Sequence, residues 1–232
     1  MRNSHDLKAV ILAAGLGSRV RHALPKCLLT LPNGETILGR QINILKKFAK
    51  EIVVVVGFKK ELIMENFPEV LYKYNPVYAS TNTARSLLCG IEHIENDDVL
   101  WLNGDVVFDE SVIPRLLECE YPCVAVNRSS KVGAEEVKYT LDEAGFIKEI
   151  SKTLKNGLGE AVGINLIKGY ALETFKNNLQ KCSNRDYFEK AIELCIKDGV
   201  KFKPVDISDA LCIEVDFIED LRRVFKRWES TL

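Results

Sequence analysis

Short apolar segments alternate with amphipathic segments along the first half of the chain. Residues 8–14 (KAVILAA), 51–57 (EIVVVVG) and 98–103 (DVLWLN) are runs of mostly apolar side chains. Each run is too short for a typical helix, and valine and isoleucine favour the pleated backbone of a strand. Because few polar side chains interrupt these runs, we expect the strands to be buried on both faces, as in a parallel sheet.

The segments between these strands have the three- and four-residue spacing of amphipathic helices. We predict helices over residues 37–49, from about Lys59, and from Thr81 or Asn82, either of which suits a helix N-cap. A further strand is predicted at residues 70–74. This alternation predicts an α/β fold: a Rossmann-like, mostly parallel central sheet with helices on both faces.

The second half of the chain predicts a smaller mixed-sheet portion. Residues 137–141 and 146–150 flank Gly145, which suits the positive φ of a hairpin turn. Further strands are predicted at 161–167 and 202–206, and helices at 170–179, at 186–197 and from Ile218. The last helix is expected to bury Leu221, Val224, Phe225 and Trp228. No linker or repeat interrupts the pattern, so we expect residues 1–232 to form a single domain.

Composition and charge exclude several classes of protein. The chain has 32 basic and 33 acidic side chains, a net charge of −1, whereas nucleic-acid-binding proteins show a concentrated basic surplus. No apolar run approaches the roughly 20 residues that span a bilayer, and the polar N-terminus lacks the apolar core of a signal peptide. Seven cysteines without a C-x-x-C pair do not form a disulfide framework, and Cys89, Cys195 and Cys212 are expected to be buried. We therefore expect a cytoplasmic protein with no nucleic-acid or membrane partner.

A glycine-containing loop follows the first strand. Residues 12–19 read LAAGLGSR, and Pro25-Lys26 follow. Backbone N–H groups at the carboxyl end of a strand can face an anion, and Arg19 and Lys26 add positive charge. The loop is neither a dinucleotide fingerprint, because Val20 stands where the third glycine would be, nor a P-loop. A tight turn with incidental surface cations is the alternative.

Residues 12–19 together with Pro25-Lys26 resemble the signature of the nucleotidyltransferase superfamily that activates sugar phosphates and phosphocholine. The resemblance implies that the loop wraps an NTP triphosphate, which Arg19 and Lys26 neutralise as catalytic residues. Ser18 and Cys27 depart from many sugar-activating members, which weakens an assignment to a sugar branch. The loop residues expected to bind the nucleotide are Leu12, Ala13, Ala14, Gly15, Gly17 and Ser18.

Two aspartates form the predicted metal site. Asp105 follows the strand at 98–103, and a carboxylate at the C-terminal tip of a parallel strand faces the crevice where such sheets bind ligands. Asp216 precedes the last helix, where it also suits a helix N-cap. The resemblance implies that Asp105 and Asp216 are catalytic residues that hold Mg²⁺ as the cofactor. Glu214 lies two residues before Asp216 on the same strand face and is a candidate neighbour of the site.

The segment from Asn75 to Leu87 resembles cytidylyltransferases that act on phosphocholine and aminoethylphosphonate. It contains N-P-x-Y followed by T-N-x-x-x-S-L. The resemblance implies that this region contacts the base and that Asn82 and Thr83 read a pyrimidine edge. A helix N-cap explains one of Thr81 and Asn82 but leaves the other unexplained. CTP is therefore the expected donor.

The acceptor site is expected in the mixed-sheet portion. The resemblance implies that Lys152, after the hairpin, binds the acceptor's phosphate, and that Glu136 and Glu160 belong to the same pocket. Tyr187, together with the acids, suits the cationic head of a zwitterion such as phosphocholine, phosphoethanolamine or aminoethylphosphonate. Glu135, Tyr139 and Phe188 are further candidates for this head-group pocket, although Tyr187 and Phe188 also suit the packed base of a helix.

The sequence thus predicts an Mg²⁺-dependent enzyme that transfers a nucleotide from an NTP to a small phosphorylated or phosphonylated acceptor and releases pyrophosphate. A sugar-1-phosphate or inositol phosphate is the alternative acceptor. The alternative from another class is a binding module that senses NTP without turnover. A homo-oligomer is compatible with the sequence.

Overall fold

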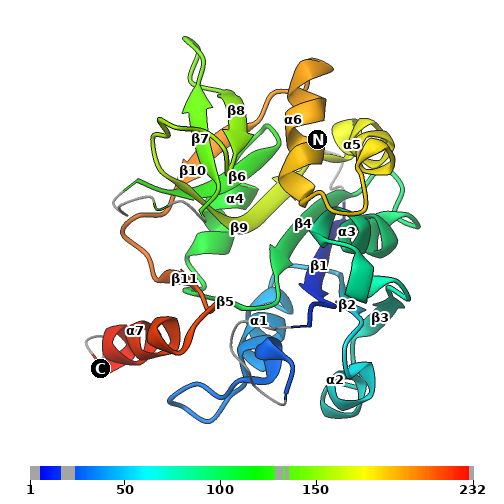
Figure 1. Cartoon of the computed structure of the whole chain (residues 1–232), viewed down its shortest axis with the longest axis vertical. Coiled ribbons are helices and arrows are strands. Elements are labelled where there is room, and N and C mark those ends of the chain that lie inside the picture. Colours follow the sequence, from blue (N-terminus) through cyan, green and yellow to red (C-terminus); the bar gives the residue numbers. More distant parts are fainter. Residues whose placement is uncertain (1–5, 17–23, 129–132, 134–135, 230–232) are drawn as a thin grey trace.

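The computed structural model of the protein describes residues 6–16, 24–128, 133 and 136–229, and strands and helices alternate along it (Figure 1). The strands are β1 (Leu7–Ala13), β2 (Glu51–Val56), β3 (Leu71–Tyr74), β4 (Asp98–Asn103), β5 (Val106–Phe108), β6 (Cys123–Asn127), β7 (Lys138–Leu141), β8 (Ile147–Ser151), β9 (Glu160–Ile167), β10 (Lys203–Asp206) and β11 (Cys212–Glu214). The helices are α1 (Ile37–Leu45), α2 (Lys60–Asn66), α3 (Thr83–Ile91), α4 (Val112–Leu117), α5 (Gly169–Lys181), α6 (Phe188–Lys197) and α7 (Ile218–Glu229), with short 3-10 turns at Lys26–Leu28 and Tyr78–Ser80.

Within the described residues, one sheet of nine strands has the path β10-β6-β9-β4-β1-β2-β3, with the hairpin β7–β8 attached to β9. Strand β1 is parallel to both β2 and β4, and β2 is parallel to β3. Strand β9 is antiparallel to both β4 and β6, and β5 and β11 form a separate antiparallel ribbon. The predicted α/β class, a mostly parallel sheet with a smaller mixed part, is therefore confirmed.

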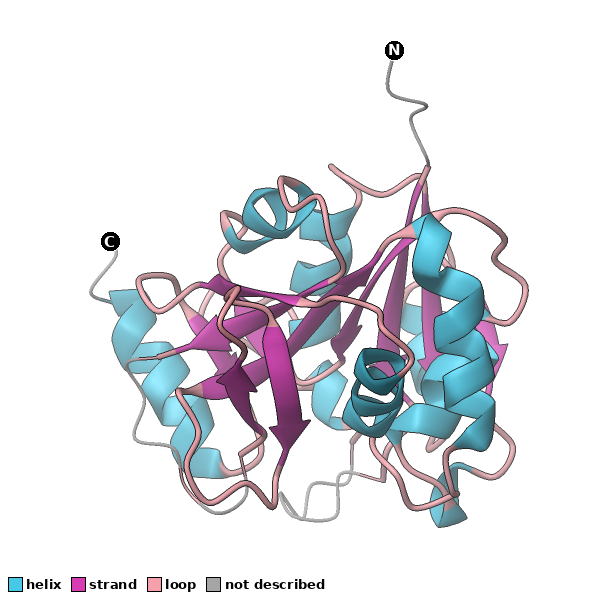
Figure 2. Cartoon of the chain, turned by 90° about the horizontal axis from the view of Figure 1, so that it is seen from above, coloured by secondary structure: helices cyan, strands magenta, loops and turns pink. Residues whose placement is uncertain are grey.

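Helices cover both faces of the sheet (Figure 2). Val10 and Leu12 of β1 pack with α3, α5 and α6, whereas Ala9, Ile11 and Ala13 pack in a second cluster with α1, α2 and α4. Because successive side chains of a strand point to opposite faces, a strand buried on both sides needs an apolar residue at every position. This requirement explains why the β1 and β2 sequences show no alternation of polar and apolar residues.

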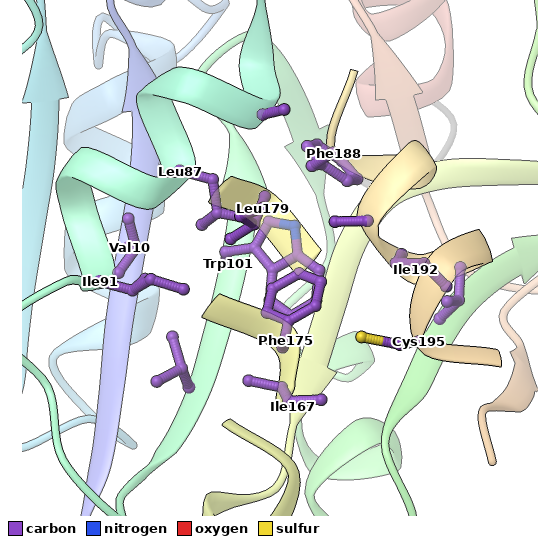
Figure 3. Packing of buried hydrophobic residues seen from close by; sticks show 14 of the residues in the cluster. Val10, Leu87, Ile91, Trp101, Ile167, Phe175, Leu179, Phe188, Ile192 and Cys195 are labelled. Atoms are coloured by element: carbon purple, nitrogen blue, oxygen red, sulfur yellow. The ribbon is translucent and has the colours of Figure 1, made fainter. Parts of the chain in front are cut away.

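Trp101 of β4 is the centre of the first cluster. It is fully buried, its ring stacks on Phe175 of α5 at 4.9 Å between centroids, and Phe188 of α6 meets it edge-on at 5.8 Å (Figure 3). Such aromatic pairs add stabilisation beyond the area that they bury. The contact fixes the first residue of α6 against the central sheet.

Several elements differ from the sequence predictions. The helix predicted over 37–49 ends at Leu45, and the short elements β5, α4 and β6 were not predicted. In α7, Val224 is buried and Leu221 and Trp228 are partly buried in a small third cluster, but Phe225 is 37% exposed, so its predicted burial is wrong. This helix contacts the rest of the protein along one narrow side only, so fewer of its apolar residues are covered.

Of the three cysteines predicted to be buried, Cys195 is buried, whereas Cys89 and Cys212 are half-buried. Among the described residues, no helix is both long and apolar enough to cross a bilayer.

Replacing Phe175 by alanine removes the ring that stacks on Trp101 and leaves a cavity in the core. We expect Phe175→Ala to lower the free energy of unfolding by about 3–5 kcal/mol, measured by urea denaturation. Tyr170→Ala on the same helix is the matched control, because Tyr170 is 70% exposed and its loss should change stability by less than about 0.5 kcal/mol. Equal effects of the two variants would contradict the assignment of Phe175 to the core.

Candidate active site

The candidate site begins where β1 and β4 end side by side. The two strands are parallel, with Leu12 opposite Asn103, so the loops that follow them leave the same edge of the sheet. The backbone N–H of Gly104 donates to the carbonyl of Leu12 at 2.9 Å. A Cβ at Gly104 would lie 2.8 Å from that carbonyl oxygen, so this approach requires glycine. The turn places Asp105 at the carboxyl edge of the sheet, as predicted.

The ribbon β5–β11 brings Asp216 to the same place. Glu214 of β11 lies opposite Val106, and the N–H of Val215 donates to the carbonyl of Asp105 at 2.9 Å. One carboxylate oxygen from each of Asp105, Glu214 and Asp216 lies within 4.8 Å of the others. Two segments about a hundred residues apart thus form one acidic cluster.

Lys26 lies between the aspartates. Its Nζ donates to Asp105 Oδ2 at 3.3 Å and to Asp216 Oδ1 at 2.5 Å. Burial alone would lower the pKa of Lys26, but the two aspartates together raise it, so the lysine is held in its charged form. One cation therefore balances part of the charge of three acids.

The remaining negative charge is costly. Burial raises the pKa of Asp105, Lys26 opposes this, and the nearby Asp216 raises the pKa further. The pKa of Glu214 is also raised, first by the loss of water around its carboxyl group in the cleft, although the residue is exposed as a whole, and then because Asp105 and Asp216 repel its charge. A divalent cation would relieve this repulsion, and three carboxylates are the hard oxygen donors that Mg²⁺ prefers. The donor set fits the predicted metal.

The predicted role of Asp216 as a helix N-cap is not observed. Helix α7 begins at Ile218, and the backbone N–H groups of Asp216 and Phe217 before it both donate to Oδ2 of Asp220 in its first turn, at 3.2 and 2.9 Å, as in the reciprocal bond of a capping box. The carboxylate of Asp216 is directed to Lys26 instead. The structure therefore separates helix capping from the acidic cluster.

A cleft of about 690 Å³ opens over this cluster, within the range of small-ligand sites. It extends from the end of β1 to the hairpin β7–β8 and the start of α6. The following predicted site residues line it: Leu12, Ala13, Ala14, Gly15, Lys26, Asn82, Thr83, Asp105, Glu136, Lys152, Glu160, Tyr187 and Asp216. The predicted Gly17, Ser18 and Arg19 lie outside the described residues, as does Glu135.

The start of α3 forms one wall of the cleft. Asn82 is its N-cap, with Oδ1 accepting from the N–H of Thr83 at 3.1 Å, and its Nδ2 donates to the carbonyl of Arg185. Thr81 Oγ1 accepts from buried Asn75 at 3.1 Å, which explains the residue that the N-cap left unexplained. Thr83 Oγ1 accepts from the N–H of Phe188 and keeps a hydroxyl hydrogen to donate. These hydrogen bonds stabilise the wall. A nucleotide base in the cleft would have to bind the same polar side chains.

A second wall, formed by the hairpin β7–β8, β9 and the start of α6, contains the predicted acceptor residues. The Nζ of Lys152 lies 4.4 Å from the ring centroid of Tyr187. Glu136 lines the same wall, and its buried Oε2 has no hydrogen-bond partner in the described part of the chain. Tyr139 is fully buried in the core, so its predicted place in the pocket is wrong. Phe188 reaches the edge of the cleft but is itself buried against Trp101.

Comparison with known proteins agrees with this arrangement. The family model described as the MobA-like NTP transferase domain matches residues 9–168, more than half of the chain. The chain belongs to this family. The predicted membership of the nucleotidyltransferase superfamily is confirmed.

The curated relatives of this chain include proteins of more than one kind. It is 33% identical over 114 residues to the bifunctional protein GlmU of Thermotoga petrophila, a match covering 48% of this chain and 25% of the relative. It is 28% identical over 243 residues to CMP-5'-(3-aminopropyl)phosphonate synthase of Streptomyces rubellomurinus, covering 94% of this chain and 38% of the relative. The chain thus spans well under half the length of both curated relatives.

The fold has a close counterpart among solved structures. The inositol-1-phosphate CTP transferase from T. maritima matches with a TM-score of 0.81 at 19% identity, covering 97% of this chain and 96% of that chain. At this identity the match establishes the fold of the NTP transferase rather than its substrate.

Two residues of the NTP transferase site were missed from the sequence. Glu189, the second residue of α6, lines the cleft, and burial raises its pKa to about 7 although the charge of Lys152 opposes this. Gln41 of α1 is buried, and its Nε2 donates to the carbonyls of Asn103 at 3.0 Å and Val106 at 2.7 Å. Neither residue belongs to a motif, since an acid in a first helical turn is ordinary and a helical glutamine is usually exposed.

We expect Gln41 to fix the turn that carries Asp105, because it binds the carbonyls on both sides of Gly104-Asp105. Gln41→Leu should lower the free energy of unfolding by about 1–3 kcal/mol, since two carbonyls lose their donor. It should also lower kcat for nucleotide transfer at least tenfold, because a small displacement of Asp105, the predicted metal ligand, would disturb the alignment of the reactants. Urea unfolding and steady-state kinetics with saturating substrates test both effects.

Asn43→Ala in the same helix is the control, because the Asn43 side chain is exposed and bonds only Glu35. A Gln41→Leu enzyme that is less stable but turns over at the wild-type rate when folded would contradict the positioning role.

Proposed function

We propose that this protein transfers a nucleotidyl group from CTP to the phosphate or phosphonate oxygen of a small acceptor, such as phosphocholine or aminoethylphosphonate, and releases pyrophosphate. The observation that carries the proposal is the cluster of Lys26, Asp105 and Asp216 at the carboxyl edge of a parallel sheet, inside one cleft. The confirmed family supports transfer from an NTP in general. The family does not specify CTP or this class of acceptor, which are the more specific parts of the proposal.

The triphosphate is assigned to the side of the cleft formed by the β1 loop. Gly15 lies in the loop immediately after β1 with no atom within 4 Å of where a Cβ would stand, so its backbone is open to a ligand. Backbone N–H groups of such a loop suit phosphate oxygens. Lys26 stands at the far end of the loop, and Arg19, outside the described residues, belongs to the loop between them. Both cations would stabilise the leaving pyrophosphate.

Asp105 and Asp216, with Glu214 beside them, are the residues that would hold Mg²⁺. When bound, the ion screens the repulsion between two anionic reactants and aligns their phosphates. Lys26 occupies part of this charge cluster in the structure and would turn its charge towards the triphosphate.

The reaction needs little acid–base chemistry from the protein. An acceptor phosphate or phosphonate is an anion near neutral pH, so one of its oxygens can attack the α-phosphorus of CTP directly. The new P–O bond forms as the bond between the α-phosphorus and the bridging oxygen breaks, and pyrophosphate leaves with the electron pair. The contribution of the protein is alignment and charge neutralisation, which suffice for phosphoryl chemistry of this kind. Lys152 would hold the acceptor anion in line.

The choice of base rests on the start of α3. Asn82 and Thr83 line the cleft and present amide and hydroxyl groups, which suit a pyrimidine edge. One relative is a CMP-5'-(3-aminopropyl)phosphonate synthase and one structural counterpart is a CTP transferase. Both support CTP as the donor.

An inositol phosphate or a sugar-1-phosphate is the second candidate acceptor. The structural counterpart from T. maritima acts on inositol-1-phosphate, which favours this alternative. A module that binds NTP without turnover is disfavoured, because binding alone does not require three carboxylates around a lysine.

Pyrophosphate release with each of four NTPs against a panel of acceptors tests the proposal. We expect CTP with phosphocholine, phosphoethanolamine or aminoethylphosphonate to exceed every other pair at least tenfold in kcat/KM. Transfer to glucose-1-phosphate or inositol-1-phosphate alone would move the protein to the second candidate, and a preference for UTP, dTTP or GTP would overturn the base assignment. Binding of NTP with no pyrophosphate from any pair would overturn the enzymatic proposal.

Asp105→Ala should lower turnover by at least a hundredfold in the presence of Mg²⁺, because the site loses its most enclosed ligand. Glu143→Ala, in the exposed turn of the hairpin, is the control and should be neutral. Circular dichroism checks that both variants fold. A variant at Asp105 that keeps more than about a tenth of the wild-type activity has lost under about 1.4 kcal/mol of transition-state stabilisation, too little for a metal ligand.

A further inference from the structure

Glu189 is an acidic residue in the cleft for which the proposed mechanism has no use. It is the second residue of α6, directly after Phe188, whose ring is fixed against Trp101. Glu189 lines the cleft, and its Oε2 is buried without a hydrogen-bond partner in the described part of the chain. A buried carboxylate oxygen in this state is normally matched by a donor or a cation.

The charged side chains near Glu189 show what could pair with it. Its own backbone N–H and the charge of Lys152 favour ionised Glu189, whereas the charge of Glu189 raises the pKa of Glu214 on the other side. The Nζ of Lys152 lies over the ring of Tyr187, two residues before Glu189. Lys152 is also the group assigned to the acceptor's phosphate. Once that phosphate binds Lys152, the lysine's charge is neutralised and Glu189 loses its attractive partner. A second positive charge, supplied by the acceptor itself, would restore the balance.

We propose that Glu189 is the specificity residue that selects an acceptor with a primary ammonium group, whose N–H donors bind its carboxylate while Lys152 holds the phosphonate or phosphate. This inference rests on the proposed function and adds the residue that reads the head group. The ammonium lies near Tyr187, an exposed aromatic residue whose ring already has the Nζ of Lys152 over it and so suits a cation. A primary ammonium fits better than a trimethylammonium, because only the former donates hydrogen bonds to Oε2.

The competing explanation is structural: an acid in the first turn of a helix stabilises that helix through its dipole. A structural role predicts that loss of the charge affects every acceptor equally. A specificity role predicts that kcat/KM falls only for the amine-bearing acceptors. A pair of acceptors that differ in the amine alone separates the two explanations.

The experiment compares 2-aminoethylphosphonate with propylphosphonate, in which a methyl group replaces the ammonium, using CTP and Mg²⁺. The wild-type enzyme should prefer the amine by at least a hundredfold in kcat/KM. Glu189→Gln, which keeps the size and a hydrogen-bond acceptor, should reduce this preference at least tenfold, almost entirely through slower use of the amine. Propylphosphonate turnover should stay within twofold of wild type and serves as the internal test of folding.

Glu193→Gln is the matched control on the same helix, because Glu193 pairs with Lys190 and Lys197 outside the cleft. It should leave the preference unchanged. Phosphocholine is a third acceptor, and the wild-type enzyme should use it less efficiently than 2-aminoethylphosphonate.

Three results would overturn the inference. An equal fall in kcat/KM for both phosphonates in Glu189→Gln would show that the residue has a structural role. Equal use of both phosphonates by the wild-type enzyme would show that it does not select the amine, although nucleotidyl transfer would still stand. The wild-type enzyme could also use phosphocholine as efficiently as 2-aminoethylphosphonate, with an equal loss in Glu189→Gln. That result would show that Glu189 recognises the positive charge and not the N–H donors. Failure of the proposed function is recognised separately, because the wild-type enzyme would then release no pyrophosphate with any phosphonate or phosphocholine.

Discussion

The repulsion among Asp105, Glu214 and Asp216 is the physical constraint on which the rest of the site depends. The three carboxylate oxygens lie within 4.8 Å of one another; burial raises the pKa of Asp105 and of Glu214, and the charge of Asp216 raises both further. Lys26 offsets part of this repulsion through its contacts with both aspartates. A protein that folds with such a cluster must hold it rigidly, because the acids would otherwise move apart into water.

The fold holds this cluster through contacts from four directions. The N–H of Gly104 binds the end of β1, the carbonyl of Asp105 binds Val215, and Gln41 binds the carbonyls on both sides of the turn. The antiparallel ribbon β5–β11 supplies the segment that carries Asp216. Each contact uses backbone atoms or a buried amide, so the position of Asp105 does not depend on a flexible side chain. Alignment of this kind is what a reaction between two anions requires.

The two walls of the cleft are tied together through the starts of two helices. The N–H of Phe188, at the start of α6, donates to Thr83 at the start of α3, and the N–H of Asn82 donates to the carbonyl of Asn184. Phe188 is in turn fixed against Trp101 in the core (Figure 3). The wall assigned to the base and the wall assigned to the acceptor are therefore parts of one packed unit. This connection explains how a site for two substrates keeps a constant geometry.

The sequence by itself determined the α/β class, because the alternation of apolar and amphipathic segments is a local pattern. Its resemblance to a known superfamily singled out Lys26, Asp105 and Asp216, whose motifs are short and contiguous. The sequence did not determine β5, α4 and β6, since elements of three to six residues depend on partners distant in the chain. It misplaced Tyr139, because which face of a short strand is buried depends on what packs against it. The roles of Gln41 and Glu189 became visible only in the tertiary structure, because both depend on contacts with residues distant in the chain, which no local pattern records.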